Sequence, residues 1–356
     1  MHATGSFHTR ENNFDFLRFF AAALVLFAHC YPLVGRKMDE PLTVLTGYEK
    51  GGGIAVGIFF VISGYLITAS YLNSRSPGSF LLKRALRIFP ALIVAVLLST
   101  FVLGPLVTTR SLDGYLSSPL TWDYLKNIAL ITTYELPGVF SHNVYPDVVN
   151  GSLWTLPLEV LMYMGVMALG LVGFLRRGLI FLPIVGLAVG HFWALDRFGI
   201  ESFFIEHIFK LGLLYYSGAA LYLYRDAIPW RGWIAALLFA SLLMTFQTFL
   251  GSVLYCIALP YLVIYLAYAP LPWVSRFGKH GDFSYGLYIY AFPFQQLTMY
   301  LLGPDTGIAT LALVSFVPTL ILAVASWHLI EAPAMKLKRL FAAPAQPGRA
   351  APSSEG

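Results

Sequence analysis

Charged residues are scarce in this chain. Asp, Glu, Lys and Arg make up 12% of its 356 residues, about half of the ~25% that is usual in soluble domains. Hydrophobic residues make up 58%, so too few charges remain to cover a water-exposed surface, and a water-soluble globular protein is excluded. The aromatic content of 16% and the lack of a repeat period argue against a fibrous or disordered chain. The composition therefore predicts a membrane protein.

Cysteine is also scarce. Cys30 and Cys256 both lie in apolar runs, so we expect each to be buried as a small hydrophobic residue. We see no set of metal-ligating residues and expect no metal. The net charge is +5, but no basic cluster is interleaved with aromatics, so we expect no nucleic-acid partner. Lys and Arg in the cytoplasmic loops of a membrane protein explain the basic balance.

Ten segments are long and apolar enough to cross a bilayer, which takes ~20 mostly apolar residues. The first lacks a signal-peptide cleavage site, so we expect it to remain attached as the first helix. We predict an all-α, polytopic membrane protein with a membrane domain over residues 1–340 and a disordered cytoplasmic tail over residues 341–356. The predicted spans are 16–35, 52–72, 88–109, 152–175, 178–196, 203–224, 231–249, 251–270, 284–302 and 308–330.

The distribution of Lys and Arg predicts the orientation of these spans. With a cytoplasmic N-terminus, 16 of the 23 Lys and Arg residues lie on the cytoplasmic side and 7 on the other side. This is the bias that cytoplasmic loops of membrane proteins show. An even number of spans then places both the N- and the C-terminus in the cytoplasm.

One loop, residues 110–151, is long for a compact protein, and loops of this length are commonly functional. It contains six Tyr, Trp and Phe residues that predict an ordered loop on the outer side: Tyr115, Trp122, Tyr124, Tyr134, Phe140 and Tyr145. Two interpretations remain open. The rings anchor the protein at the lipid headgroups, or they offer stacking faces for a sugar.

Three of the ionisable residues within the predicted spans are candidate functional residues, because such groups are costly there and often functional. Arg18 lies at the cytoplasmic edge, and a snorkelling anchor is its alternative role. The rise of a helix places His29 ~9 Å and Glu159 ~12 Å below the outer surface, so they lie at similar depth. At one level, an imidazole and a carboxylate can act as a general base and its orienting partner. A purely structural His–Glu pair is the alternative.

Three basic residues, Lys83, Arg84 and Arg87, precede the third predicted span. If this stretch is helical, Arg84 and Arg87 point the same way because they are three positions apart. Clustered guanidinium groups suit phosphates through bidentate, charge-assisted hydrogen bonds. The alternative is the ordinary basic loop of a cytoplasmic surface.

Small and polar residues also fall inside the spans. Ser63 and Gly64 lie near the middle of the second, where Gly64 favours close helix packing and no nucleophile motif surrounds Ser63. The polar stretch 282–290 opens the ninth span, followed by Gln295 and Gln296. We consider Ser63, Ser152 and Tyr288 candidates to line a cavity.

Over residues 13–340 the sequence resembles the acyltransferase-3 family of integral-membrane O-acyltransferases. Each motif is weak alone, but together and in this order they are specific. The motifs are Phe14–Arg18 followed by His29, the run 59–67, Arg84–Pro90, Ser152–Glu159, Phe283–Tyr290 and Glu331–Pro333.

The resemblance implies an enzyme of the bacterial inner membrane that takes an acyl group, commonly acetyl, from cytoplasmic acyl-CoA. The acceptor is then a hydroxyl of a surface or lipid-linked glycan at the outer face, amid membrane lipids. By the same resemblance, His29 and Glu159 are catalytic, and Arg84 and Arg87, with Arg18, bind the donor. Transfer is either direct or through an acyl group on His29. It is completed either by this domain or by a separate protein.

A transporter or flippase for a glycan or small molecule is the alternative function. It explains ten helices and polar residues within the membrane equally well. However, we find no inverted half-repeat and no pair of broken helices at matching positions. The sequence therefore favours the enzyme.

Overall fold

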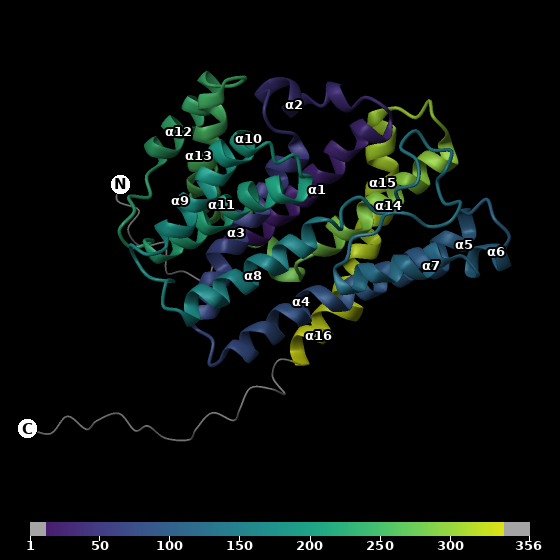
Figure 1. The fold of residues 1–356 in the computed structure, drawn as a ribbon, viewed down its shortest axis with the longest axis horizontal. Coiled ribbons are helices and arrows are strands. Elements are labelled where there is room, and N and C mark those ends of the chain that lie inside the picture. Colours follow the sequence, from purple (N-terminus) through teal and green to yellow (C-terminus); the bar gives the residue numbers. More distant parts are fainter. Residues whose placement is uncertain (1–11, 338–356) are drawn as a thin grey trace, which may run out of the picture.

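The computed structural model describes residues 12–337, and these form a bundle of helices (Figure 1). Each predicted span contains a helix, whereas the predicted tail lies outside the described residues. The long helices are α1 (Phe14–Leu33), α3 (Gly51–Leu72), α4 (Pro77–Leu98), α8 (Thr155–Leu171), α9 (Phe181–Val189), α11 (Phe203–Leu223), α12 (Gly232–Met244), α13 (Phe249–Tyr268), α14 (Ser284–Leu302) and α15 (Ile308–Ser326). The short ones are α2 (Pro41–Thr46), α5 (Gly104–Val107), α6 (Leu112–Leu116), α7 (Pro119–Asp123), α10 (Leu195–Phe198) and α16 (Ala332–Lys336).

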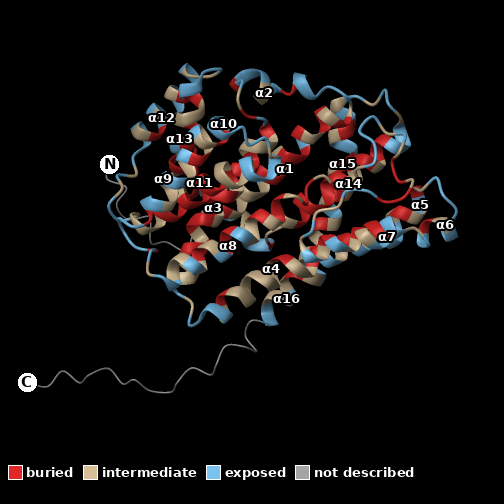
Figure 2. Ribbon diagram, in the orientation of Figure 1, coloured by how far each residue is buried: buried red, intermediate tan, exposed pale blue. Residues whose placement is uncertain are grey.

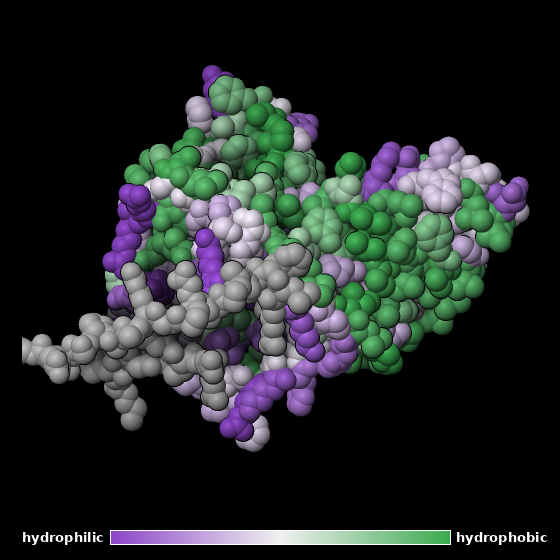
Figure 3. All heavy atoms as spheres, turned by 90° about the horizontal axis from the view of Figure 1, so that it is seen from below, coloured by the Kyte–Doolittle hydropathy of each residue, from purple (hydrophilic) through white to green (hydrophobic). Residues whose placement is uncertain are grey.

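Six helical segments within residues 12–337 are long and apolar enough to cross a membrane. Of the other predicted spans, α8 and α12 are short, with 17 and 13 residues. Helices α11 and α14 are long enough, but they contain polar residues such as Lys210 and Gln295, which lower their mean hydropathy. The polytopic, all-helical class is thus confirmed, with six spans by these criteria instead of ten. Hydrophobic side chains cover a broad band of the face in Figure 3, and hydrophilic ones gather mainly toward its two ends. The six are Phe14–Leu33, Gly51–Leu72, Pro77–Val107, Phe181–Phe198, Phe249–Tyr268 and Ile308–Lys336.

Helix α3 lies at the centre of the bundle and packs against α1, α8 and α11, and buried residues concentrate there (Figure 2). The contact with α11 is close because glycines meet backbone. Gly64 faces the carbonyl of Tyr215, and Gly218 faces the carbonyl of Val61, so an added Cβ would clash at either position. The predicted packing role of Gly64 is confirmed.

Helix α4 begins at Pro77, well before the predicted start of the third span at residue 88. Ser76 caps it, since its side chain accepts a hydrogen bond of 3.2 Å from the Ser79 amide, and Pro is favoured at the first helical position. The basic residues that seemed to end the apolar run therefore lie inside the helix. Arg84 and Arg87 occupy its second and third turns.

The loop 110–151 is ordered, as its aromatics predict. Tyr115, Tyr124 and Phe140 are buried, and the Tyr115 hydroxyl donates a hydrogen bond of 2.7 Å to the carbonyl of Thr100. Trp122 is exposed. Three rings thus hold the loop in place, and both interpretations stay open for the exposed ones.

Two buried glutamines of α14 connect it to its neighbours. Gln295 donates a hydrogen bond of 2.7 Å to the carbonyl of Leu26 in α1. Gln296 donates to the carbonyls of Tyr145 and Val148, each at 2.7 Å. These polar residues hold the loop 110–151 and α1 against α14. Both cysteines are free and buried, as predicted.

Candidate active site

A cavity of about 700 Å³ lies between α1, α3, α4, α8 and α14, within the ~300–1,000 Å³ typical of ligand pockets. On α3 its wall extends from Val56 to Ile67, which corresponds to ~16 Å along the helix axis. It also includes Arg18, near the start of α1, and Thr155, at the start of α8. These two helices begin at opposite ends of the bundle, so the cavity passes through much of its depth.

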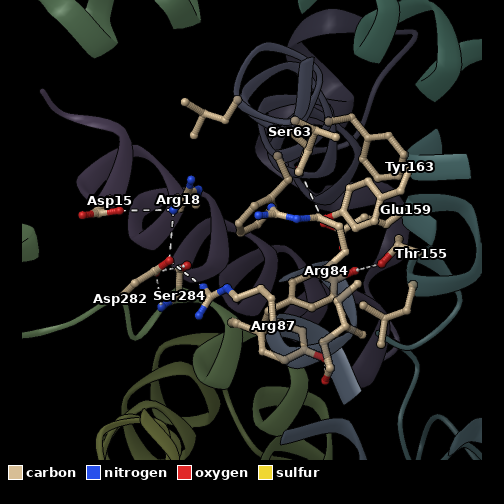
Figure 4. Close-up of a pocket in the computed structure, with 18 of the residues that line it drawn as sticks. Asp15, Arg18, Ser63, Arg84, Arg87, Thr155, Glu159, Tyr163, Asp282 and Ser284 are labelled. Carbon is tan, nitrogen blue, oxygen red and sulfur yellow. Dashed lines mark hydrogen bonds and ion pairs between the residues drawn. The ribbon is translucent and has the colours of Figure 1, made fainter. Parts of the chain in front are cut away.

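One end of the cavity is an ion-pair network around Asp282, which precedes α14 (Figure 4). Arg18 donates hydrogen bonds to Asp282 at 3.0 Å and to Asp15 at 3.1 Å. Arg87 donates to the same Asp282 oxygen, and Ser284 donates to the other. Asp282 therefore holds two arginines from different helices side by side.

Arg87 has further partners beyond Asp282. It donates a hydrogen bond of 3.1 Å to Glu331, whose other carboxylate oxygen accepts one of 3.0 Å from Ser326. Its guanidinium lies over the rings of Tyr285 and Trp327, at 5.7 and 5.6 Å from their centres. Arg87 is thus neutralised by two carboxylates and held on its faces by aromatic rings.

Asp282 is ionised in this setting. Burial disfavours its charged form, yet the guanidiniums of Arg87 and Arg18 and the hydrogen bonds from Ser284 lower the pKa of Asp282 below its ordinary value. Because a lowered carboxyl pKa means that folding favours the charged form, the network stabilises the protein at neutral pH.

Arg84 differs from Arg87 although it lies one turn away on α4. It lines the cavity, and Figure 4 shows it pointing inward. Its Nε is buried without a hydrogen-bond partner, and no ion pair joins it to any residue in the range 12–337. A cation in this state is available to an anionic ligand.

Glu159 lies on the cavity wall, in the second turn of α8. Its carboxylate accepts a hydrogen bond from the Tyr163 hydroxyl one turn away and one of 3.4 Å from Ser63 on α3. Figure 4 shows these side chains around the same part of the cavity as Arg84. The structure therefore brings Glu159, Ser63 and the predicted donor-binding arginines into one cavity.

Tyr288 also lines the cavity, next to the start of α8. Its hydroxyl lies 2.7 Å from the Thr155 hydroxyl and donates to the Ser152 carbonyl at 3.0 Å. The Ser152 hydroxyl itself is buried without a partner, and Ser152 is not part of the cavity wall. Of the three candidate lining residues, two lie on the wall and Ser152 lies behind it.

His29 lies on α1, away from the cavity wall. Its ring makes an edge contact with Phe292, with centres 5.2 Å apart, and its Nδ1 is buried without a hydrogen-bond partner. Within the described chain, no hydrogen bond joins His29 to Glu159. The structure thus brings Glu159 together with the arginines and gives His29 separate surroundings.

Two further residues of the site, Asp15 and Tyr163, were not singled out by the sequence, and Asp282 was noted only as the first residue of the polar stretch 282–290. Tyr163 follows Glu159 by four positions, the spacing of helical neighbours, so its contact was open to prediction. Asp15 and Asp282 carry weaker signals, because a carboxylate at a helix start is equally typical of capping. Their pairing with Arg18 depends on the approach of α14 to α1.

The acyltransferase domain that defines the acyltransferase 3 family matches residues 11–328. Because the match covers most of the chain, this protein belongs to that family and is a multi-pass membrane acyltransferase. The motifs had implied the same family, and membership favours the enzyme over the transporter.

Two relatives match almost from end to end. An "O-acetyl transferase" of Shigella phage Sf6 is 35% identical over 338 residues, which cover 90% of this chain and 95% of the relative. "Nodulation protein 10" of Rhizobium leguminosarum bv. viciae is 31% identical over 367 residues, which cover 92% of this chain and 94% of the relative. No solved structure matches this chain.

Proposed function

We propose that this protein transfers an acetyl group from acetyl-CoA, on the cytoplasmic side of the bacterial inner membrane, to a hydroxyl of a surface or lipid-linked glycan at the outer face. The observation that carries the proposal is the single cavity that contains both the unpaired Arg84 and the carboxylate of Glu159. The name of the phage relative supports acetyl as the acyl group and oxygen as the accepting atom.

The proposed orientation has both termini in the cytoplasm, with ten helices crossing or entering the membrane. The excess of Lys and Arg on the N-terminal side supports it. In this orientation α1 and α4 begin at the cytoplasmic face, so Arg18 and Arg84 lie toward the donor. Helix α8 begins at the outer face, so Thr155 and Glu159 lie toward the acceptor.

We propose that the donor's phosphates bind at the arginine end of the cavity. Arg84 fits this role because its buried Nε lacks a partner and a phosphate oxygen would supply one. Lys83 adds a second cation on the wall. Arg18 and Arg87 are already paired with carboxylates, so they contribute through position more than through free charge.

We propose that His29 and Glu159 carry out the proton transfer. A base removes the proton of the sugar hydroxyl, the oxygen attacks the thioester carbonyl, and the carbon–sulfur bond breaks to release coenzyme A, which takes up a proton. The free Nδ1 of His29 and the cavity position of Glu159 support these roles. Catalytic hydrogen bonds often form only with substrates bound, so their separate contacts are compatible with a base and its partner.

The test is acetyl transfer in proteoliposomes containing purified protein, acetyl-labelled acetyl-CoA and a mixed extract of bacterial surface polysaccharide. Wild-type protein should move label to carbohydrate, and His29→Ala should abolish transfer while still inserting into the membrane. Normal transfer by His29→Ala would contradict the catalytic assignment. Lack of any labelled carbohydrate with the wild type would contradict the proposed reaction.

A further inference from the structure

A second cavity of about 220 Å³ lies beside the first and shares no lining residue with it. Its walls come from the segment before α3, from the π-helical turn Gly190–Ala194 and α10, and from the first turns of α11 and α13. In the proposed orientation all these segments lie at the outer face. The cavity holds about seven water molecules at ~30 Å³ each, so a molecule the size of one monosaccharide fits.

The polar groups of this cavity are mostly acceptors. Glu49 and Lys210 form a buried ion pair, so their charges cancel. Asp196 and Glu206 add two carboxylates to the wall. The surplus of carboxylate oxygens favours a ligand with hydrogen-bond donors, and it repels a phosphate-bearing ligand such as acyl-CoA.

Tyr255 provides a second, independent sign of a ligand. Its side chain lines the cavity and is only 5% exposed, yet its hydroxyl has no hydrogen-bond partner. The Nδ1 of His191, which also lines the cavity, is likewise buried without a partner. Unpaired buried polar atoms are costly, so both groups are expected to gain a partner when the cavity is filled.

We propose that the second cavity binds one sugar residue of the acceptor glycan, next to the residue that is acetylated. The proposal rests on the proposed function and names where the acceptor is held. Sugar hydroxyls match the surplus of acceptors and the free Tyr255 hydroxyl. The rings of Tyr48, Phe192 and Phe249 on the wall match the apolar faces of a sugar ring.

The short separation of the two cavities supports this assignment. Trp154 directly precedes Thr155, which lines the first cavity, and His207 directly follows Glu206, which lines the second. Trp154 packs against His207, with ring centres 4.7 Å apart. One aromatic contact thus separates the two cavities, so a sugar in the second would lie close to the first.

The test is direct binding of short, fluorescently end-labelled oligosaccharides, released from bacterial surface polysaccharide by mild acid, to purified protein without acyl-CoA. Tyr255→Phe removes only the hydroxyl and should weaken binding by about tenfold, as expected for one lost hydrogen bond. Glu206→Gln should weaken it similarly. Tyr265→Phe, on the same helix but away from both cavities, is the matched control and should bind like the wild type. Unchanged acetyl-CoA binding shows that each variant is folded.

Acetyl transfer measured in parallel separates this proposal from the proposed function. Equal binding by wild type and Tyr255→Phe, or no binding by the wild type, overturns the sugar site even if acetyl transfer proceeds. Binding that depends on Tyr255, without transfer to any glycan, supports the sugar site and contradicts the transferase reaction. A raised KM for glycan in Tyr255→Phe, with an unchanged KM for acetyl-CoA, supports both.

Discussion

Arg84 and Arg87 lie one turn apart on α4 and line the same cavity, but their surroundings are opposite. Arg87 is paired with Asp282 and Glu331 and is enclosed by aromatic rings. Arg84 has neither a hydrogen bond nor an ion pair to any residue between 12 and 337. Arg87 therefore completes the framework of the site, whereas Arg84 is left for a ligand.

The same contrast separates two regions of the cavity. Around Asp282, each buried charge has an opposite charge beside it, which is the condition for tolerating it at low dielectric. Around Glu159, the carboxylate receives only hydroxyl groups, from Ser63 and Tyr163. We therefore expect variants in the first region to change stability, and variants in the second to change activity.

Among the residues that line the cavity, the largest expected effect is that of Glu159→Gln. Glutamine keeps the size of the side chain but cannot accept a proton, so kcat should fall by about 10²- to 10⁴-fold, the usual contribution of general acid–base catalysis. Thermal unfolding in detergent should change little, because Ser63 and Tyr163 can still donate to the amide oxygen. Glu201→Gln, an exposed carboxylate outside both cavities, is the control. A Glu159→Gln rate close to that of the wild type would place the base elsewhere.

Arg87→Met should mainly reduce stability. It leaves Glu331, which is 1% exposed, without its counter-charge, and breaking a buried pair in this way costs about 3–5 kcal/mol. The midpoint of thermal unfolding, followed by fluorescence size-exclusion chromatography, should fall. Combining Arg87→Met with Glu331→Gln should recover part of the loss, because the orphaned charge is then removed. An unchanged midpoint in the single variant would mean that the framework role is wrong.

Arg84→Met should give the reverse pattern. Removing the Arg84 guanidinium breaks no hydrogen bond or ion pair with residues 12–337, so the unfolding midpoint should stay or rise. The KM for acetyl-CoA should increase about tenfold to a hundredfold, since hydrogen bonds to charged groups contribute about 1.5–3 kcal/mol. Arg84→Lys keeps the charge but loses the bidentate geometry, so it should fall in between. An unchanged KM for acetyl-CoA would mean that Arg84 does not bind the donor.

Apolar runs and residue spacing in the sequence were sufficient to predict most of the helices. Apolar runs located ten helices, and the spacing of Arg84 and Arg87 correctly predicted that both point the same way from one helix, where they line one cavity. The predicted start of the helix that contains α4 was wrong because the basic residues ended the apolar run. Ser76 and Pro77 signal a helix start upstream of them. Charged residues inside a helix weaken a hydropathy window without weakening the helix.

Tertiary partners could not be predicted in this way. Asp282 and Glu331 lie 195 and 244 positions after Arg87, and only the packing of α14 and of the π-helical turn Trp327–Glu331 against α4 brings them together. The similar depth of His29 and Glu159 was likewise not enough to predict their contacts. Rise along a helix axis fixes the level of a residue but not the direction of its side chain, so two residues at one level can face different neighbours.

The smallest expected effect is that of Ser63→Ala, and it decides what kind of residue Ser63 is. If Ser63 only donates to Glu159, at the long distance of 3.4 Å, its loss removes about 0.5–1.5 kcal/mol, and initial rates should fall no more than about tenfold. Tyr163 still donates to the same carboxylate, so Ser63→Ala combined with Tyr163→Phe should lose more than either alone. Complete loss of transfer in Ser63→Ala, with an unchanged unfolding midpoint, would instead make Ser63 a nucleophile. The role of Glu159 would then change to activating that hydroxyl.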